Sequence, residues 1–209
     1  MTLADFKRVL KKRGLDAALF VTTDSCIDKS IYYLTGIRVG LGFLIVYPNK
    51  RPVLYVTSLE QVHSSVVTIK TIQKRDEVLD SLQGKVGLNY AVLSKKSFDR
   101  LKKKGVRYVD VSEDVQKLRT VKSSSEVAKH KKAVAIAESI FRKVFSGLKN
   151  KVFSTEKDVA DFMFLETLKQ GCTLAFDTIV ASGAGAASPH YVPAGKLKKG
   201  FCVIDFGVR

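Results

Sequence analysis

Two residues near the end of the chain have side chains and surroundings suited to chemistry. His190 lies between Pro189 and Tyr191, in a segment that follows the small-residue stretch 182–187. Small residues let a backbone approach a ligand closely, and prolines fix the path of the chain. An imidazole in such a loop can hydrogen-bond a substrate or shuttle a proton near neutral pH. A structural or merely exposed histidine fits the same local pattern, so both interpretations stay open at this point.

Asp205 is the second candidate, because it ends the apolar run Phe201–Ile204. A carboxylate there is costly to bury unless it is paired or bound to a metal, whereas one that turns into solvent needs no partner. A single carboxylate cannot hold a metal, and the sequence has neither an H-E-x-x-H motif nor paired-carboxylate spacing. The stretch Gly183–Gly185 precedes no predicted helix, so we do not expect a phosphate-binding loop.

The segments around these residues predict two helices and then two strands. Ser123 and Glu126 form a capping-box pattern, which predicts the start of a long helix at Ser124 with one apolar face. A second helix is expected from Ser154/Thr155 to Gly171. Strands are expected at 176–181 and 201–206, on either side of the loop that carries His190. This order is typical of an α+β layout.

The first 110 residues follow a different pattern, in which short apolar runs alternate with amphipathic stretches. This alternation predicts a mixed α/β domain. A helix ending at Gly14, a strand at 17–21 and a hairpin of 43–47 with 53–56 come first. The further predicted strands are 66–72, 85–88 and 106–109, and the further predicted helices are 58–64, 76–82 and 97–104.

Taken in order, the motifs resemble the Xaa-Pro aminopeptidase, prolidase and creatinase family, which are M24-type "pita-bread" metallopeptidases. The resemblance spans almost the whole chain and depends on the order and spacing of its segments. In chain order, these are Tyr33–Gly36, Leu118–Glu126, Thr155-Glu156, Ala175–Gly183, Pro189–Tyr191, Leu197–Gly200 and Val203–Gly207.

The resemblance implies an α/β creatinase/prolidase-like N-terminal domain at residues 1–117. The first part of an α+β pita-bread metallopeptidase domain is implied at 118–209. In the family, the residue matching Asp205 is the first ligand of two divalent metal ions, for which Mn, Co or Zn are suitable. The residue matching His190 lies near the substrate and helps to bind it, which makes His190 the catalytic and substrate-binding candidate. The implied reaction is hydrolysis of a peptide bond preceding proline, and the implied assembly is a homodimer.

The chain departs from the family pattern in its metal ligands. A second Asp, a His and two Glu of the family would fall beyond Arg209, so one of five ligands is present. We therefore expect a truncated chain that binds no metal stably and is inactive. One alternative is a catalytically dead pita-bread-like module that binds protein or nucleic acid, as some relatives without metals do. Another is a free-standing N-terminal domain with a vestigial tail.

The composition limits the partners. The net charge of +16 is spread along the 209 residues, with +10 over residues 1–119 and +6 over residues 120–209. Nucleic acid is therefore expected to bind only non-specifically. No apolar run reaches the roughly 18–20 residues that cross a bilayer, so no membrane partner is expected. Three cysteines without C-x-x-C spacing predict free thiols and a cytoplasmic protein.

Overall fold

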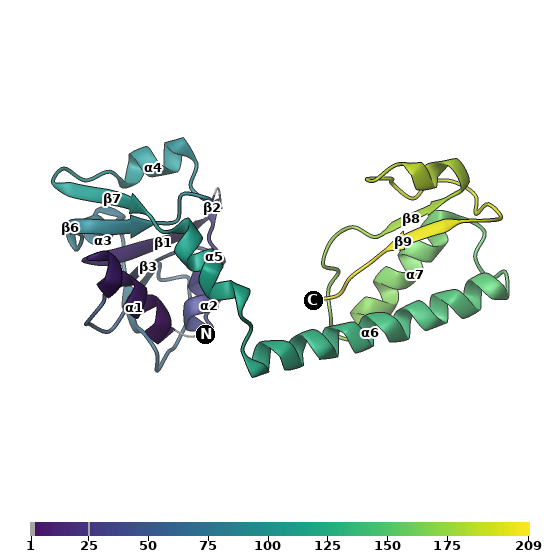
Figure 1. Cartoon of the computed structure of the whole chain (residues 1–209), viewed down its shortest axis with the longest axis horizontal. Helices are drawn as coiled ribbons and strands as arrows, with labels where there is room; N and C mark the ends of the chain where they lie inside the picture. The colour runs from purple at the N-terminus through teal and green to yellow at the C-terminus, as the bar shows by residue number, and fades with distance from the viewer. Residues whose placement is uncertain (1–2, 25) are drawn as a thin grey trace. The chain divides into compact units, whose positions relative to one another are not determined.

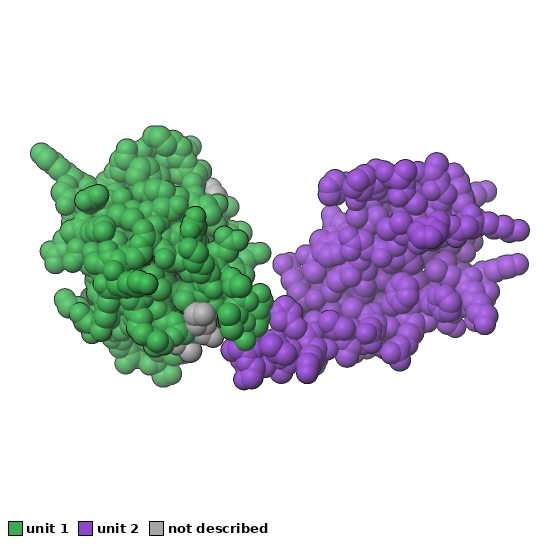
Figure 2. Space-filling model, in the orientation of Figure 1, with its two compact units in different colours: residues 1–122 green, residues 123–209 purple. Residues whose placement is uncertain are grey.

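The computed structural model describes residues 3–24 and 26–209 of the chain. The chain divides into two compact units, Met1–Lys122 (unit 1) and Ser123–Arg209 (unit 2), which are coloured separately in Figure 2. The sequence predicts two independently folding domains that meet between residues 117 and 118, and this boundary stays a prediction. None of the helices in the described ranges has both the length and the apolar composition to cross a membrane.

Unit 1 is built on a mixed sheet with the order β5-β4-β3-β1-β6-β7, and β2 pairs with β1. The sheet is antiparallel at β1/β3, β3/β4 and β1/β2, and parallel at β1/β6, β6/β7 and β4/β5. The strands are β1 (Ala17–Thr23), β2 (Cys26–Ile27), β3 (Gly42–Val46), β4 (Val53–Val56), β5 (Thr68–Thr71), β6 (Gly84–Leu88) and β7 (Val106–Asp110).

Helices cover both faces of this sheet (Figure 1). Alternate residues of a strand point to opposite faces, so Phe20 belongs to one apolar cluster and Leu19 to the other. The first cluster includes residues of α1 (Leu3–Arg13), α2 (Ser30–Thr35) and α5 (Ser112–Thr120). The second includes residues of α3 (Asp76–Asp80) and α4 (Lys95–Leu101). The predicted α/β class and the predicted hairpin of β3 with β4 are confirmed.

One predicted helix of unit 1 does not form, and two helices form that the sequence analysis did not predict. No helix forms at 58–64, where the Glu60 carboxylate instead accepts hydrogen bonds from the backbone N–H groups of Gly40 (2.6 Å) and Leu41 (2.9 Å). The helices α2 and α5 were not expected. The first ends inside the Tyr33–Gly36 motif, and Gly36 takes up a left-handed conformation (φ 74°) as its C-cap, which favours glycine at that position.

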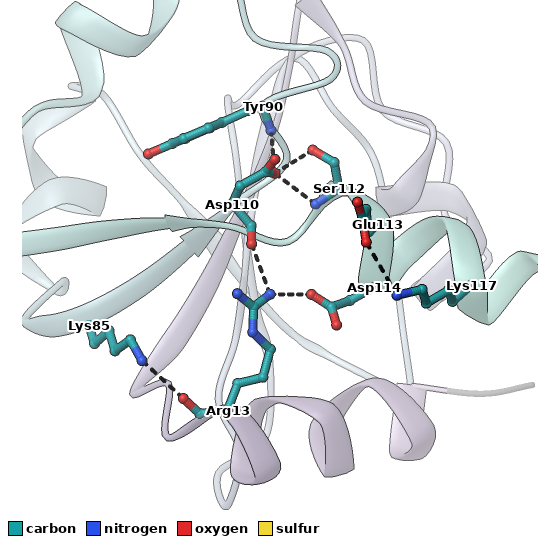
Figure 3. Close-up of polar contacts among 8 residues, drawn as sticks. All are labelled: Arg13, Lys85, Tyr90, Asp110, Ser112, Glu113, Asp114 and Lys117. Carbon is teal, nitrogen blue, oxygen red and sulfur yellow. Dashed lines mark hydrogen bonds and ion pairs between the residues drawn. The ribbon is translucent and has the colours of Figure 1, made fainter.

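Polar contacts join α1, β7 and α5 at one edge of unit 1 (Figure 3). Arg13 forms an ion pair with Asp114 and donates to the backbone carbonyl of Asp110 (2.8 Å). The Asp110 carboxylate accepts from the N–H groups of Ser112 (2.8 Å) and Tyr90 (3.4 Å). Burial acts to raise the pKa of Asp110, but these hydrogen bonds and the charge of Arg13 hold the pKa below its usual value.

Unit 2 consists of two helices and a two-stranded sheet: α6 (Ser124–Lys149), α7 (Glu156–Lys169), β8 (Ile179–Ser182), η1 (Gly183–Ala187) and β9 (Cys202–Asp205). The capping box of Ser123 and Glu126 is confirmed, and Thr155 with Asp158 forms a second one at the start of α7. Both strands are shorter than predicted. The glycine-rich stretch, which was not expected to be helical, forms the short 3-10 helix η1.

Candidate functional site

Asp205 lies at the end of β9, on the face of the small sheet that points away from the helices. Strands β8 and β9 pair antiparallel with Ile179 opposite Asp205 and Val180 opposite Ile204. Val180 is buried, and Ile204 packs against the same apolar cluster, which contains residues of α6 and α7. Because successive side chains of a strand alternate between faces, Asp205 projects to the other face, where its side chain is exposed. Of the two interpretations that the sequence left open for Asp205, the one in which the carboxylate turns into solvent fits its position within this chain.

His190 lies in the connection between η1 and β9, and its side chain is exposed. In the described parts of the chain, no hydrogen bond or ion pair to its imidazole is seen. Two other residues of this region, Ser182 and Tyr191, are better anchored. Ser182 at the end of β8 is buried, and Tyr191 is partly buried. The imidazole is thus presented to solvent by a loop whose neighbouring residues are held.

The anchor of this loop is Glu156, the first residue of α7, whose side chain is 1% exposed. One carboxylate oxygen, Oε1, accepts from the N–H of Ser182 (2.7 Å) and from its hydroxyl (2.8 Å). The other, Oε2, accepts from the Tyr191 hydroxyl (2.8 Å) and from the N–H of Gly195 (2.8 Å). Burial alone would raise the pKa of Glu156, but the four hydrogen bonds outweigh it and lower the pKa to about 2.

Further contacts fix the chain on the far side of His190. The N–H of Glu156 donates to the Gly195 carbonyl (2.9 Å), and the N–H of Leu197 donates to the Ser154 carbonyl (3.0 Å). The Lys198 N–H donates to the Ser182 hydroxyl (3.0 Å), which itself donates to Glu156. Both ends of the loop between β8 and β9 are therefore joined to the start of α7.

Tyr191 also requires a glycine beneath it. A Cβ atom added to Gly185 would lie 2.8 Å from Cε2 and 2.9 Å from Cζ of the Tyr191 ring. This separation is shorter than any van der Waals contact between carbon atoms, so the ring packs directly on the backbone of η1. The small-residue stretch that the sequence singled out thus makes room for the tyrosine next to His190.

The described residues do not make up a metal centre. No three side chains of the types His, Cys, Asp and Glu come together in a group able to hold an ion within the described ranges. Divalent ions in proteins need several such donors, and Asp205 supplies one exposed carboxylate. We therefore assign no reaction step to a metal held by these residues alone.

A shallow hollow of about 280 Å³ also lies in unit 2, between α6 and β9, but it contains neither candidate residue. Its lining is mostly apolar and includes the exposed Phe141 side chain. The lining residues are Ala137, Glu138, Phe141, Arg142, Ile204 and Phe206. It has no set of polar groups that converge on one point, which a specific small-molecule site requires.

Glu156 is the residue of this region whose importance the sequence did not reveal. It belonged to the matched Thr155-Glu156 pair, but a glutamate in the first turn of a helix is usually explained by the helix dipole and by solvent exposure. The only available signal was the loop with glycines and a tyrosine, which lies further along the sequence. Nothing in the spacing of those residues indicated that their hydrogen-bond donors would converge on one carboxylate.

Comparison with known proteins identifies both parts of the chain. Residues 3–121 match the Creatinase/Prolidase N-terminal domain, and residues 128–209 match Metallopeptidase family M24. An uncharacterized peptidase of Staphylococcus epidermidis is 31% identical over 99% of this chain and 61% of its own length. The Xaa-Pro dipeptidase of Pyrococcus horikoshii is 27% identical over 95% of this chain and 57% of its own length.

Solved structures show the same fold. The prolidase from Pyrococcus horikoshii OT3 aligns with a TM-score of 0.83 at 25% identity, over 99% of this chain and 60% of the prolidase chain. The Xaa-Pro dipeptidase from Bacillus anthracis has a TM-score of 0.83 at 24% identity, over 98% and 60% of the two chains. The chain spans about 60% of the length of these relatives. It belongs to the family that joins a creatinase/prolidase N-terminal domain to a domain of Metallopeptidase family M24.

Proposed function

We propose that this chain is the front portion of a metal-dependent peptidase of the Xaa-Pro aminopeptidase or prolidase type, which cleaves the bond preceding proline. The observation that carries this proposal is that both domains of one peptidase family match the chain in the right order. A relative that covers 95% of this chain is described as an Xaa-Pro dipeptidase. The substrate in this proposal is a peptide with proline in the second position.

In this proposal, Asp205 supplies one ligand to a pair of divalent ions, and His190 hydrogen-bonds the substrate. A pair of bound ions would supply an activated water and polarise the scissile carbonyl. The exposed positions of both side chains support these roles, since each is free to meet a group outside unit 2. We further propose that the 209-residue chain is inactive by itself, because one carboxylate cannot fix two ions.

Two proteins test these statements. The 209-residue chain, assayed on Xaa-Pro peptides with Mn²⁺, Co²⁺ or Zn²⁺, should show no turnover that a chelator abolishes. A chimera that continues this chain with the remaining residues of the Staphylococcus epidermidis relative should hydrolyse the Xaa-Pro peptides. Asp205→Ala and His190→Ala should each reduce the chimera's activity. Chelator-sensitive turnover by the 209-residue chain that Asp205→Ala removes would refute inactivity, and an active chimera insensitive to Asp205→Ala would refute the ligand role.

The rival proposal is a metal-free binding module for protein or nucleic acid, which the net charge of +16 favours. Fluorescence anisotropy with single- and double-stranded DNA over a salt series distinguishes it. Non-specific charge attraction gives affinity that falls steeply with salt and does not depend on sequence. Binding that keeps a sequence preference at physiological salt, together with an inactive but folded chimera, would favour the binding module.

We also propose that the protein is cytoplasmic and forms a homodimer. The three free cysteines support the first statement, because unpaired thiols persist in reducing compartments. Exposed apolar residues in unit 2 support self-association. Light scattering over a dilution series should give a mass of twice 23.1 kDa at micromolar concentration. A single 23.1 kDa species at every concentration would rule out the dimer for this chain.

A further inference from the structure

We propose that Glu156 is a positioning residue for His190, and that this role requires a carboxylate at position 156 and not merely a polar side chain. The role of His190 toward substrate rests on the proposed function, whereas the positioning of the loop does not. Glu156 lies on α7, and the loop that carries His190 connects β8 to β9. The two are joined by the four hydrogen bonds that converge on one buried side chain.

The donors are distributed so that they define the path of the loop. Ser182 lies at its start, Gly195 lies beyond its middle, and Tyr191 is the next residue after His190. A loop of this length loses much conformational entropy when it is ordered, so it needs fixed points along its course. Because Tyr191 is held at both its hydroxyl and its ring, the backbone next to His190 has little freedom to move.

An amide cannot replace the carboxylate. Each oxygen of Glu156 accepts from one backbone N–H and one hydroxyl. In glutamine, one of the two positions becomes an NH₂ group, which donates and does not accept. A hydroxyl can turn to accept from it, but the N–H of Ser182 or of Gly195 cannot. In either orientation of the amide, one buried backbone N–H loses its partner, and such a loss is expensive.

Glu166 provides a matched comparison on the same helix. It is also buried (5% exposed), but its partners are the side chains of Lys143 and Lys169, and none of them belongs to the loop. If Glu156 acted only by stabilising unit 2 as a whole, removing the charge of either glutamate would have similar consequences. If Glu156 positions the loop, only its substitution should release His190.

The test uses the full 209-residue chain and nuclear magnetic resonance, because the chain has only three histidines. Ring relaxation of His190 is compared with that of His63 and His130, and amide exchange is measured at Ser182 and Gly195. In Glu156→Gln we expect at least one of these two amides to exchange roughly tenfold faster, and the His190 ring to gain mobility on the nanosecond timescale. His63 and His130 should be unchanged, and Glu166→Gln should leave all these signals within about twofold of the unsubstituted chain.

Tyr191→Phe keeps the test decisive if Glu156→Gln fails to fold. This variant removes one hydroxyl and leaves the ring on Gly185, so unit 2 should stay folded while His190 becomes more mobile. Unchanged His190 relaxation in a folded Glu156→Gln protein, or in Tyr191→Phe, would overturn the proposal. Equal release of the loop by Glu166→Gln would overturn it too. None of these measurements needs turnover, so an inactive chimera would refute the proposed function and leave this result standing.

Discussion

The two units of the chain differ in what fills their interiors. Among the described residues, 29 apolar residues are buried in unit 1 and six in unit 2, although each unit buries five polar or charged residues. In unit 1 the polar groups are a small addition to two large apolar clusters. In unit 2 they are nearly as numerous as the apolar residues. Unit 1 is therefore stabilised mainly by apolar burial, whereas unit 2 depends far more on satisfied hydrogen bonds.

The surfaces of the two units show the opposite difference, because unit 2 exposes more apolar side chains than unit 1. Among the residues that the structure describes, twelve large apolar side chains are exposed in unit 2 and seven in unit 1, although unit 2 is the shorter of the two. The apolar stripe predicted along α6 illustrates this, because Ile140 and Val144 are buried while Phe141 is 46% exposed. The described residues of unit 2 thus leave uncovered much of the surface that its helices could bury. Because unit 2 buries few apolar residues and exposes many, we expect it to be less stable than unit 1.

The sharpest test of this comparison is the same kind of truncation in each unit. Met163→Ala and Leu44→Ala each remove a fully buried side chain, which typically costs about 2–5 kcal/mol. We expect Met163→Ala to unfold unit 2 and Leu44→Ala to leave unit 1 folded with a lower melting temperature. Hydrogen exchange followed by mass spectrometry reports on each unit separately. If both units lost protection to the same degree, the difference in their interiors would not translate into stability.

Limited trypsin digestion should give the next largest effect. Lys122 follows the 65% exposed Val121, at the division between the units, so we expect the first stable fragment to end there. Further cuts should accumulate in unit 2 roughly tenfold faster than in unit 1. A stable fragment ending within residues 125–145 would mean that part of α6 folds with unit 1. It would also contradict the proposed domain division near residue 118.

Acid should lower the stability of unit 2 relative to that of unit 1, because it protonates Glu156. Its pKa is about 2 in the folded chain and 4.5 when unperturbed, so the ionised form is favoured by folding. The resulting stabilisation is complete above pH 4.5 and is lost as the pH falls toward 2. The difference in melting temperature between the unsubstituted chain and Glu156→Gln should therefore be constant from pH 7 to 5 and shrink below it. A difference that does not change with pH would show that the charge of Glu156 is not involved.

The smallest expected effect concerns Thr178, just before β8. Its side-chain oxygen is buried without a hydrogen-bond partner among the described residues. Thr178→Val removes this unpaired group and keeps the shape, so unit 2 should be unchanged or stabilised by less than about 1 kcal/mol. Ser182→Ala is the matched control, because the Ser182 hydroxyl has two partners and its loss should destabilise. Destabilisation by Thr178→Val would indicate an unseen partner for the hydroxyl.

Much of the fold could be predicted because local patterns agree with the tertiary structure. The helix cap at Ser123 and the hairpin of β3 and β4 depend on residues that are close in sequence. The helix predicted at 58–64 fails because Glu60 is drawn into hydrogen bonds with Gly40 and Leu41, about 20 residues away. Propensity carries no information on such a contact, and tertiary context overrides it.

The candidate site was predictable only as separate residues. His190 and Asp205 were identified from the chemistry of their types, and their proposed roles come from the family resemblance. Glu156 was missed because its four donors come from three residues that lie 26 to 39 positions further along the chain. A single sequence records the presence of these groups but not their convergence. Satisfied buried charges are therefore the features that need a structure to be seen.

The register of β8 with β9 sets how this region can change in evolution. Asp205 reaches the open face only because it pairs with Ile179, and a shift of one residue would turn it toward the helices and expose Ile204. Insertions or deletions in the loop that carries His190 can leave that pairing intact. A single-residue deletion within β9 cannot leave the pairing intact, because every β9 side chain that precedes the deletion would move to the opposite face of the sheet. We therefore expect length variation among relatives to be confined to the loop and absent from the strand.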